Sequence, residues 1–512
     1  MKISVYACLI LFVVASYGCG GSSSPPRKVS ATNAGSDAIS TTVVGPITGR
    51  AFNSWIWPLD EFDYEEFEFF VSGEAIPYEF QSTALPVSTT ETSSNTGVQK
   101  YSTRFMVYRP KNPEDFNGIA IVEWTNVSAQ FDIPLDLIWA HPFAFKHGYM
   151  YITVSAQEAG ICGQKFDTGV CSPTSLKSWN AERYESLEHP GDDYSFDIFS
   201  QVIQAVRQTT NVELLDNYPD IEYVIAVGQS QSAGRLSGYL CNGADTAAQV
   251  VDGFIGDDDA RIGTQCLPRV PNIQLWSEYA ARPVESTSSE NLEIWMTPGA
   301  PHEDKWQSLF EVEFSGANNL GAEPSVSAEE LRETAGNWGQ EGVVEGAGST
   351  ACLPEGNAYQ KRYIFNTALH ALTQWITTGL KPPTAPPIDF NPTATVGNTF
   401  SAHPGSYNLD EHGNALGGMR LPFMDVPVAT YIGVTCSLFG KSIPFSLAKN
   451  MTLYESEDDY ISKLSAAVNK AVEDGVLLRE DAEDMMRRAC AFPVVGGELT
   501  SCPEVNAQSY YD

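Results

Sequence analysis

A serine set between small residues is the clearest chemical signal in this 512-residue sequence. Gly228-Gln229-Ser230-Gln231-Ser232 follows the apolar run 223–227 and precedes a helix-favouring segment, 232–240. A sharp turn from a strand into a helix presents its middle residue at the edge of a sheet, and small neighbours relieve the crowding. The pattern therefore predicts Ser230 as a nucleophile. Ser232 is the minor alternative, and a serine that only caps the helix is the non-catalytic interpretation.

A serine hydroxyl is activated by a base, and the base is oriented by an acid. On a strand-to-helix turn the chain order is serine, acid, histidine. Four of the seven histidines follow Ser230, namely His302, His370, His403 and His412. His302 lies in a loop after the apolar run 292–296, where an imidazole would stand beside the serine. We predict His302 as the base, with His412, in the turn 410–414, as the second choice.

The acid has two candidate positions. Glu278 follows the predicted strand 272–276, one strand before the histidine loop, which is the usual place for it. Asp257, Asp258 and Asp259 follow the preceding strand, which is an acceptable second place. Glu278 is the favoured acid, and the aspartate run stays open as the alternative.

An oxyanion formed on the substrate needs two hydrogen-bond donors. The backbone N–H of Gln231 is one, because it follows the nucleophile at the start of a helix. The second comes from the loop Thr125-Asn126-Val127-Ser128, in which we name Asn126 without deciding which N–H donates. The sequence has no C-x-x-C and no H-E-x-x-H motif, so it predicts no metal site, and it indicates no cofactor.

The elements that position these residues alternate between strands and helices. Short apolar runs predict strands at 64–71, 100–108, 118–124, 149–154, 223–227, 250–255, 272–276 and 292–296. Helices are predicted at 192–207, 232–240, 358–378 and 456–474, and residues 313–350 read as irregular apart from one short helix capped by Ser327. The alternation predicts an α/β fold with a mostly parallel sheet and helices on both faces.

The chain divides into four predicted segments. Residues 1–19 resemble a signal peptide with an apolar run too short to span a bilayer, and residues 20–45 read as a flexible linker. Residues 46–380 form the catalytic domain, and 381–512 are a C-terminal addition for which a lid over the site is one interpretation. Cys19 stands where a bacterial lipoprotein signal has its lipidated cysteine. We therefore expect export, either as a periplasmic or cell-surface lipoprotein or as a secreted protein.

Cysteine usage agrees with an oxidising compartment. Without Cys8 and Cys19, eight of the ten cysteines remain, an even number. Proximity in the sequence favours the pairs Cys162–Cys171, Cys241–Cys266 and Cys490–Cys502, which leaves Cys352 with Cys436.

The charge balance bears on binding partners. With 30 Lys and Arg against 64 Asp and Glu, the net charge is −34. Such a surface repels phosphate backbones, so nucleic-acid binding is excluded as an expectation. The acidity alone names no substrate, and a lipidated Cys19 would anchor the protein to a membrane.

Several segments together resemble a largely uncharacterised α/β-hydrolase-domain family of bacteria and fungi. They are Val122-Glu123-Trp124-Thr125-Asn126-Val127-Ser128, His189-Pro190-Gly191-Asp192-Asp193-Tyr194-Ser195-Phe196-Asp197-Ile198, Gly228-Gln229-Ser230-Gln231-Ser232-Ala233-Gly234-Arg235, the 299–302 loop and His412-Gly413-Asn414-Ala415-Leu416-Gly417-Gly418-Met419-Arg420-Leu421-Pro422. The resemblance covers roughly residues 50–490 and implies an α/β-hydrolase fold with ester hydrolysis. It places the family's serine at Ser230 and its histidine at His302.

The predicted function is therefore an exported serine hydrolase, a carboxylesterase that works through an acyl-enzyme on Ser230. The substrate that this function implies is a small-molecule or polymeric ester. Two rival hypotheses stay open. One is a non-catalytic surface-binding lipoprotein on a hydrolase scaffold, since a fold does not dictate a function. The other is an amidase or peptidase that uses the same three residues.

Overall fold

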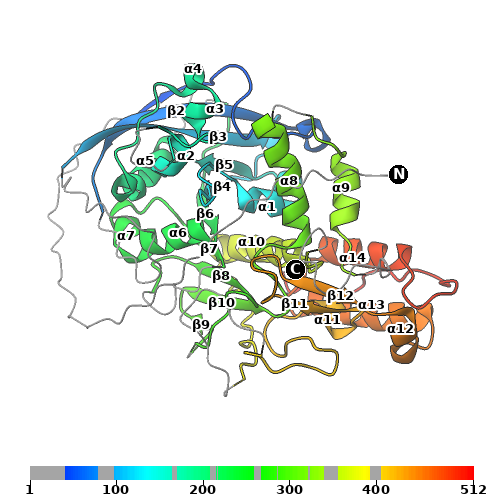
Figure 1. The fold of residues 1–512 in the computed structure, drawn as a ribbon. Coiled ribbons are helices and arrows are strands. Elements are labelled where there is room, and N and C mark those ends of the chain that lie inside the picture. Colours follow the sequence, from blue (N-terminus) through cyan, green and yellow to red (C-terminus); the bar gives the residue numbers. More distant parts are fainter. Residues whose placement is uncertain are drawn as a thin grey trace. The chain divides into compact units, whose positions relative to one another are not determined.

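The structure is a computed structural model that describes residues 41–511, except 79–96, 164–169, 208–214, 216, 259–266, 285, 321–322, 340–355 and 392–404 (Figure 1). The predicted signal peptide, Cys19 and residues 20–40 of the predicted linker lie outside the described residues. The end of that linker is not irregular, because Thr42–Val44 forms strand β1 and pairs with β2. Residues 40–512 belong to one compact unit, so the segment after residue 380 is not a separate body.

Within the described residues the main sheet has ten strands, in the order β1-β2-β3-β5-β4-β6-β7-β8-β10-β9. From β5 to β10 the neighbours are parallel, whereas β1, β2 and β3 join antiparallel at one edge and β9 joins antiparallel at the other. The mostly parallel sheet predicted from the sequence is confirmed. The bounds are β2 Tyr64–Ala75, β3 Gln99–Pro110, β4 Ile119–Trp124, β5 Met150–Val154, β6 Tyr223–Gln229, β7 Gly253–Asp257, β8 Asn272–Ser277, β9 Ser288–Ser289 and β10 Leu292–Thr297.

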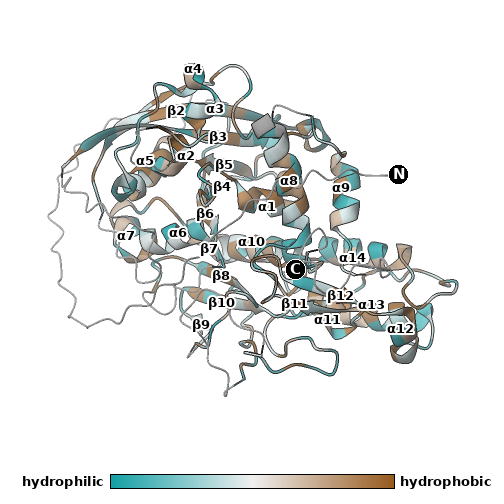
Figure 2. Ribbon diagram, viewed as in Figure 1, coloured by the Kyte–Doolittle hydropathy of each residue, from teal (hydrophilic) through white to brown (hydrophobic). Residues whose placement is uncertain are grey.

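The central strands are apolar without alternation because helices cover both of their faces. Along β6, Ile225 and Val227 belong to one buried cluster, whereas Val224 and Ala226 belong to the other. Figure 2 shows hydrophobic residues along these strands and along α1. Helices α1, α8 and α10 contribute to the first cluster, and α5 and α6 to the second.

The helices vary from single turns to five turns. Their bounds are α1 Leu135–Lys146, α2 Glu158–Ile161, α3 Leu176–Trp179, α4 Ala181–Tyr184, α5 Ser195–Arg207, α6 Gln231–Cys241, α7 Ala244–Ala248, α8 Lys305–Leu320, α9 Ala328–Ala335, α10 Lys361–Thr378, α11 Pro422–Asp425, α12 Leu447–Leu453, α13 Glu457–Glu473 and α14 Arg479–Ala491. Short 3₁₀ turns lie at Leu59–Phe62, Pro113–Asp115 and Asp192–Tyr194. In the part of the chain that the structure describes, no helix is both long and apolar enough to cross a bilayer.

The expectation for residues 313–350 was partly wrong. Helix α8 runs on to Leu320, into the segment expected to be irregular. The short helix capped by Ser327 is confirmed as α9, because the Ser327 hydroxyl accepts a 3.1 Å hydrogen bond from the N–H of Glu330.

The C-terminal addition packs on the first hydrophobic cluster. The predicted apolar stripe of α13 is buried, with Tyr460, Leu464 and Val468 at 0 % exposure. Helix α14 is tied to α10 by a 2.6 Å ion pair between Arg362 and Asp484. Strands β11 (Ala429–Ile432) and β12 (Lys441–Pro444) form a separate antiparallel pair.

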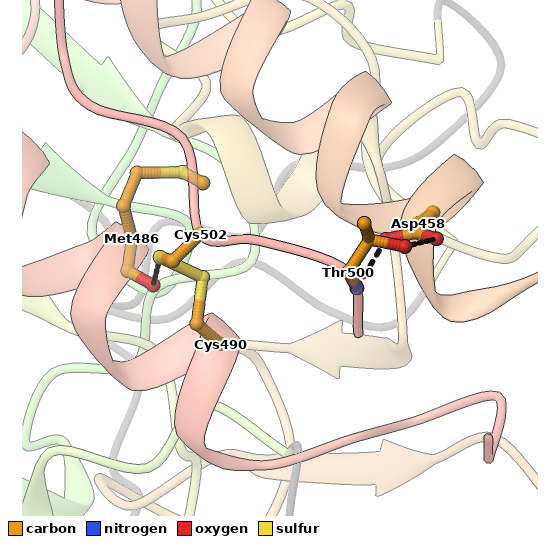
Figure 3. The surroundings of a disulfide bond; sticks show 5 residues. All are labelled: Asp458, Met486, Cys490, Thr500 and Cys502. Atoms are coloured by element: carbon orange, nitrogen blue, oxygen red, sulfur yellow. Dashed lines mark hydrogen bonds between the residues drawn. A yellow bond between two sulfur atoms is a disulfide. The ribbon is translucent and has the colours of Figure 1, made fainter. Parts of the chain in front are cut away.

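Two predicted disulfides are confirmed, Cys162–Cys171 and Cys490–Cys502. Figure 3 shows the second, which joins the end of α14 to the C-terminal segment beside the Thr500–Asp458 contacts. Cys241 and Cys436 are also disulfide-bonded. The partners predicted for them, Cys266 and Cys352, lie outside the described residues.

Candidate active site

Ser230 stands on a strained turn between β6 and α6. Its backbone has φ 59° and ψ −115°, a conformation that non-glycine residues rarely adopt. Its N–H donates a 2.8 Å hydrogen bond to the carbonyl of Asp257 at the end of the neighbouring strand β7. Its side chain makes no capping hydrogen bond to helix α6. The helix-capping interpretation of this serine is therefore excluded, and the hydroxyl stays available at the carboxyl end of the sheet.

The small residues that flank Ser230 have separate steric roles. A Cβ atom on Gly228 would lie 3.0 Å from the carbonyl carbon of Ser232 and 3.1 Å from the N of Ala233, so the close approach of helix α6 requires glycine. The Ser232 hydroxyl donates to the carbonyl of Gln229 at 2.9 Å and accepts from its N–H at 3.0 Å. Ser232 thus closes the turn, which makes it a poor alternative nucleophile.

His302 lies in the loop between β10 and α8, and its imidazole contacts an aspartate. Nδ1 of His302 lies 3.0 Å from Oδ2 of Asp258, and the two side chains are 10 % and 0 % exposed. Asp258 directly follows β7 and has a positive φ of 57°. Its other oxygen, Oδ1, accepts a 2.6 Å hydrogen bond from the N–H of Ser277. Both oxygens are therefore held, and Asp258 can orient the imidazole.

The prediction that Glu278 is the acid beside His302 is contradicted by this geometry. Glu278 is buried after β8, but its Oε2 accepts a 2.6 Å hydrogen bond from the N–H of Gly299. Its Oε1 accepts a 3.1 Å hydrogen bond from the N–H of Gly433 in the C-terminal addition. Glu278 joins two loops, while Asp258, in the aspartate run left open as the alternative, is the carboxylate that contacts the imidazole. Asp259 lies outside the described residues.

The serine turn and the histidine loop are tied together beneath the site. Nε2 of Gln229 donates to the carbonyl of His302 at 3.0 Å, and Gln307 exchanges side-chain hydrogen bonds with Gln229. Within the described residues, no hydrogen bond joins the Ser230 hydroxyl directly to the imidazole of His302. Such contacts in ligand-free hydrolases often tighten only when substrate binds.

A lysine lies under the His302–Asp258 pair. Lys361, the first residue of α10, places Nζ 3.1 Å from Oδ2 of Asp258 and 3.1 Å from Oδ2 of Asp257. Burial raises the pKa of Asp258, but Lys361 and His302 lower it more, so the net pKa is below its ordinary value. Burial raises the pKa of Asp257 and outweighs the lowering by Lys361. Asp258 is therefore the ionised member of this buried pair.

Of the two predicted oxyanion donors, one is available in the structure and the other is already hydrogen-bonded. Gln231 is the first residue of α6, and the first amides of a helix have no partner within it, so its N–H can serve. The N–H of Asn126 donates to the carbonyl of Ile133 at 2.9 Å, and Nδ2 donates to the carbonyl of Gln229 at 3.0 Å. The prediction that Asn126 donates to the oxyanion is therefore contradicted, since its N–H closes a backbone bridge.

Val127 is a better placed donor in the same loop. Its N–H donates a 3.2 Å hydrogen bond to Oε1 of the Gln231 side chain, next to the nucleophile turn. Nε2 of that side chain donates to Oε1 of Gln157 at 2.7 Å. A substrate oxygen that took the place of the Gln231 amide oxygen would meet the N–H of Val127.

The 189–198 motif supports the site from behind. Asp192 accepts hydrogen bonds from Nε2 of Gln157 at 2.8 Å and from the N–H of Glu158 at 3.0 Å. It also pairs with Arg235 of α6 at 2.6 Å. This carboxylate therefore fixes the Gln157 loop against the nucleophile helix.

The other histidines are placed elsewhere. His412, the second choice for the base, faces Glu411 at 3.9 Å and packs against Phe445. His370 packs against Phe143 and Tyr511, and His403 lies outside the described residues. In the described part of the chain, no group of three or more His, Cys, Asp and Glu side chains is arranged to hold a metal ion.

Sequence reasoning did not identify Lys361 as part of the site, and it included Val127 in the oxyanion loop without choosing its N–H. Lys361 is the first residue of a helix that lies about 100 residues after Asp258 in the sequence. The only signal in the sequence is that residues 356–366 contain no Asp or Glu, so the lysine has no acidic partner among its sequence neighbours. Val127 contributes a backbone group, which leaves no trace in residue type.

The comparisons with known proteins agree with this geometry. A search of curated proteins gives no match. A family model described as "Alpha/beta hydrolase domain" matches residues 26–487, which is most of the chain. The strand-turn-helix at Ser230, the parallel sheet and this match agree, and the chain belongs to the alpha/beta hydrolase domain family.

Proposed function

We propose that this protein is an exported serine hydrolase that cleaves carboxylic esters through an acyl-enzyme on Ser230. The observation that carries the proposal is the positive-φ turn at Ser230, whose neighbour Gln229 is hydrogen-bonded to the loop of the His302–Asp258 pair. Strain of this kind persists where the surrounding structure holds it, and it is concentrated at active sites. The family match supports hydrolysis, and the choice of an ester is the finer part of the proposal.

In the proposed reaction, Ser230 Oγ attacks the ester carbonyl carbon while Nε2 of His302 takes the hydroxyl proton. Asp258 accepts a hydrogen bond from Nδ1–H, which leaves Nε2 free to act as the base. The N–H groups of Gln231 and Val127 bind the oxyanion, the latter after the Gln231 side chain has moved away. His302 then returns the proton to the departing alcohol, and water cleaves the acyl-enzyme by the same route.

The test is fluorophosphonate labelling of the mature protein, with mapping of the labelled peptide. We expect the adduct on Ser230 and its loss in Ser230→Ala and in His302→Ala. His412→Ala is the matched control and should label at the wild-type rate. Folded protein that takes no label at Ser230 would overturn the proposal in favour of a binding role.

Ester and amide specificity are compared on one acyl group. We expect p-nitrophenyl acetate to be hydrolysed much faster than p-nitroacetanilide, because a phenolate leaves without protonation and an anilide does not. A faster anilide reaction would favour the amidase or peptidase hypothesis.

Export is the second part of the proposal. The disulfides Cys162–Cys171 and Cys490–Cys502 support an oxidising compartment. We propose cleavage before Cys19 and lipidation of that residue, which mass spectrometry of the mature N-terminus tests. A diacylglyceryl-modified Cys19 is the expected result, and an unmodified start elsewhere would mean free secretion.

A further inference from the structure

All three N–H groups of the Lys361 ammonium have hydrogen-bond acceptors beneath the candidate active site. Its Nζ lies 3.1 Å from Oδ2 of Asp257, 3.1 Å from Oδ2 of Asp258 and 2.9 Å from the carbonyl oxygen of His302. An ammonium group has three N–H donors, so these three acceptors satisfy it completely. The side chain is 6 % exposed, and Nζ lies 4.5 Å from the ring centre of Trp139.

The backbone of Lys361 is anchored as well. Its N–H donates a 2.8 Å hydrogen bond to Oδ2 of Asp304, two residues after His302. One residue at the start of α10 is thus bound to the histidine loop twice, through its backbone and through its side chain. These two links fix the position of the lysine against the histidine loop.

The surroundings supply the reason for the charge. Carboxyl groups that face this region come from β4 (Glu123), α1 (Asp136), β7 (Asp257 and the following Asp258) and the histidine loop (Glu303 and Asp304), and all of them except Glu303 are fully buried. Other titratable groups of this region are the imidazole of His302, with Tyr279 packed 5.3 Å from its ring centre, and the hydroxyls of Tyr151 and Tyr407. Burial raises the pKa of Glu123 to about 8, and that of Asp136 well above its ordinary value. Carboxyls in such surroundings tend to take up protons, and Lys361 is the cation that contacts Asp258.

We propose that Lys361 is a positioning residue for the proposed hydrolase, which keeps Asp258 ionised against its carboxyl neighbours and holds the backbone of His302. The inference rests on the proposed function, because it concerns the acid of the same site. The positive charge of Lys361 disfavours a further positive charge close to it, because like charges repel in a buried site. We therefore expect hydrolysis to persist to lower pH with Lys361 than without it.

The test is the pH profile of kcat/KM for p-nitrophenyl acetate. In Lys361→Met, which keeps the length of the side chain and removes the charge, we expect the acid limb to move to higher pH by about one to two units. Adding Asp257→Asn should leave the acid limb of Lys361→Met where it is, because burial raises the pKa of Asp257 and a protonated carboxyl carries no charge to remove. A lysine that served packing alone would give an unshifted acid limb in every variant.

Controls separate this inference from the proposed function. Lys381→Met breaks a comparable 2.9 Å pair with the buried Glu293 elsewhere and should leave the acid limb unchanged. If Lys361→Met does not fold, Lys361→Gln decides, because it also removes the charge while its amide can still donate hydrogen bonds, and it should move the acid limb to higher pH. If the wild type hydrolyses the ester and the Lys361 variants show no shift of the acid limb, only the role of Lys361 is overturned. If the wild type shows no hydrolysis that depends on Ser230, the proposed function itself is overturned.

Discussion

Oε2 of Glu278 accepts a 2.6 Å hydrogen bond from the N–H of Gly299, which lies three residues before His302. The same carboxylate reaches the N–H of Gly433 with its other oxygen. Glu278 thus holds the histidine loop by its backbone, while Asp258 holds the imidazole itself. The two acids near the site have separable roles, and the first prediction separates them.

Asp258→Asn should lower kcat by about 10⁴-fold, because an amide in this position favours the wrong imidazole tautomer. Glu278→Gln should lower kcat by less than about tenfold in protein that stays folded, because it does not contact the imidazole. Steady-state kinetics with p-nitrophenyl acetate at pH 7.5 compare them. A larger loss in Glu278→Gln, with native circular dichroism, would restore Glu278 as the acid.

Glu278 should also make stability depend on pH. Burial raises its pKa from 4.5 to about 7, even though its two N–H partners lower it. Between these values the folded chain holds a proton that the unfolded chain has released. Its contribution to stability is therefore full below about pH 4.5 and is lost as the pH rises through about 7. Relative to Glu278→Gln, the wild type should lose about 3 kcal/mol of unfolding free energy over this window.

Urea unfolding of both proteins at pH 5, 6, 7 and 8 measures this difference. The wild-type curve should approach or cross the Glu278→Gln curve as the pH rises. A constant difference over the whole range would show that Glu278 titrates at its ordinary value in the folded protein.

Gly228 should tolerate no side chain. In Gly228→Ala the added Cβ would lie 3.0 Å from the backbone of Ser232, so helix α6 must shift and move Ser230 with it. We expect a destabilisation of about 1–3 kcal/mol and a fall in kcat of more than about tenfold. Gly316→Ala in α8 is the matched control, because its Cβ meets nothing within 4 Å. It should be neutral or stabilising by up to about 1 kcal/mol. Equal kcat in both variants would contradict the crowding argument.

The Cys490–Cys502 disulfide should stabilise the C-terminal addition. It closes a loop with a sequence separation of 12, so Cys490→Ser/Cys502→Ser should lose about 2–3 kcal/mol of unfolding free energy. The pair Cys162→Ser/Cys171→Ser, with a separation of 9, is the matched comparison and should lose a similar or slightly smaller amount. The urea midpoint of each double variant measures the loss. An unchanged midpoint for the first would mean that the 490–502 segment does not unfold with the rest.

Much of the fold could be predicted from the sequence because the central strands are buried on both faces. Such strands appear as short apolar runs, and the run at 223–227 led directly to the Ser230 turn. Helix α1 could not be found in the same way. Ten of its residues are buried, so it has no polar face to mark a helical period, and Pro142 lies inside it.

The choice of acid could not be made from the sequence for a different reason. Asp258 and Glu278 follow adjacent parallel strands, β7 and β8, and both reach the same edge of the sheet. What distinguishes them is side-chain direction, set by the positive φ of Asp258 and by the N–H groups that bind Glu278. Neither of these is visible in residue types.

The Gly433–Glu278 hydrogen bond shows what the protein would lose without its C-terminal segment. The carbonyl of Leu438 accepts a further 3.0 Å hydrogen bond from the N–H of Glu303, directly after His302. A chain that ended near residue 380 would leave the Glu278 carboxylate and the histidine loop without these hydrogen-bond partners. Deleting or exchanging the C-terminal segment would therefore disturb the histidine loop as well, so the two parts of the chain form one structural unit.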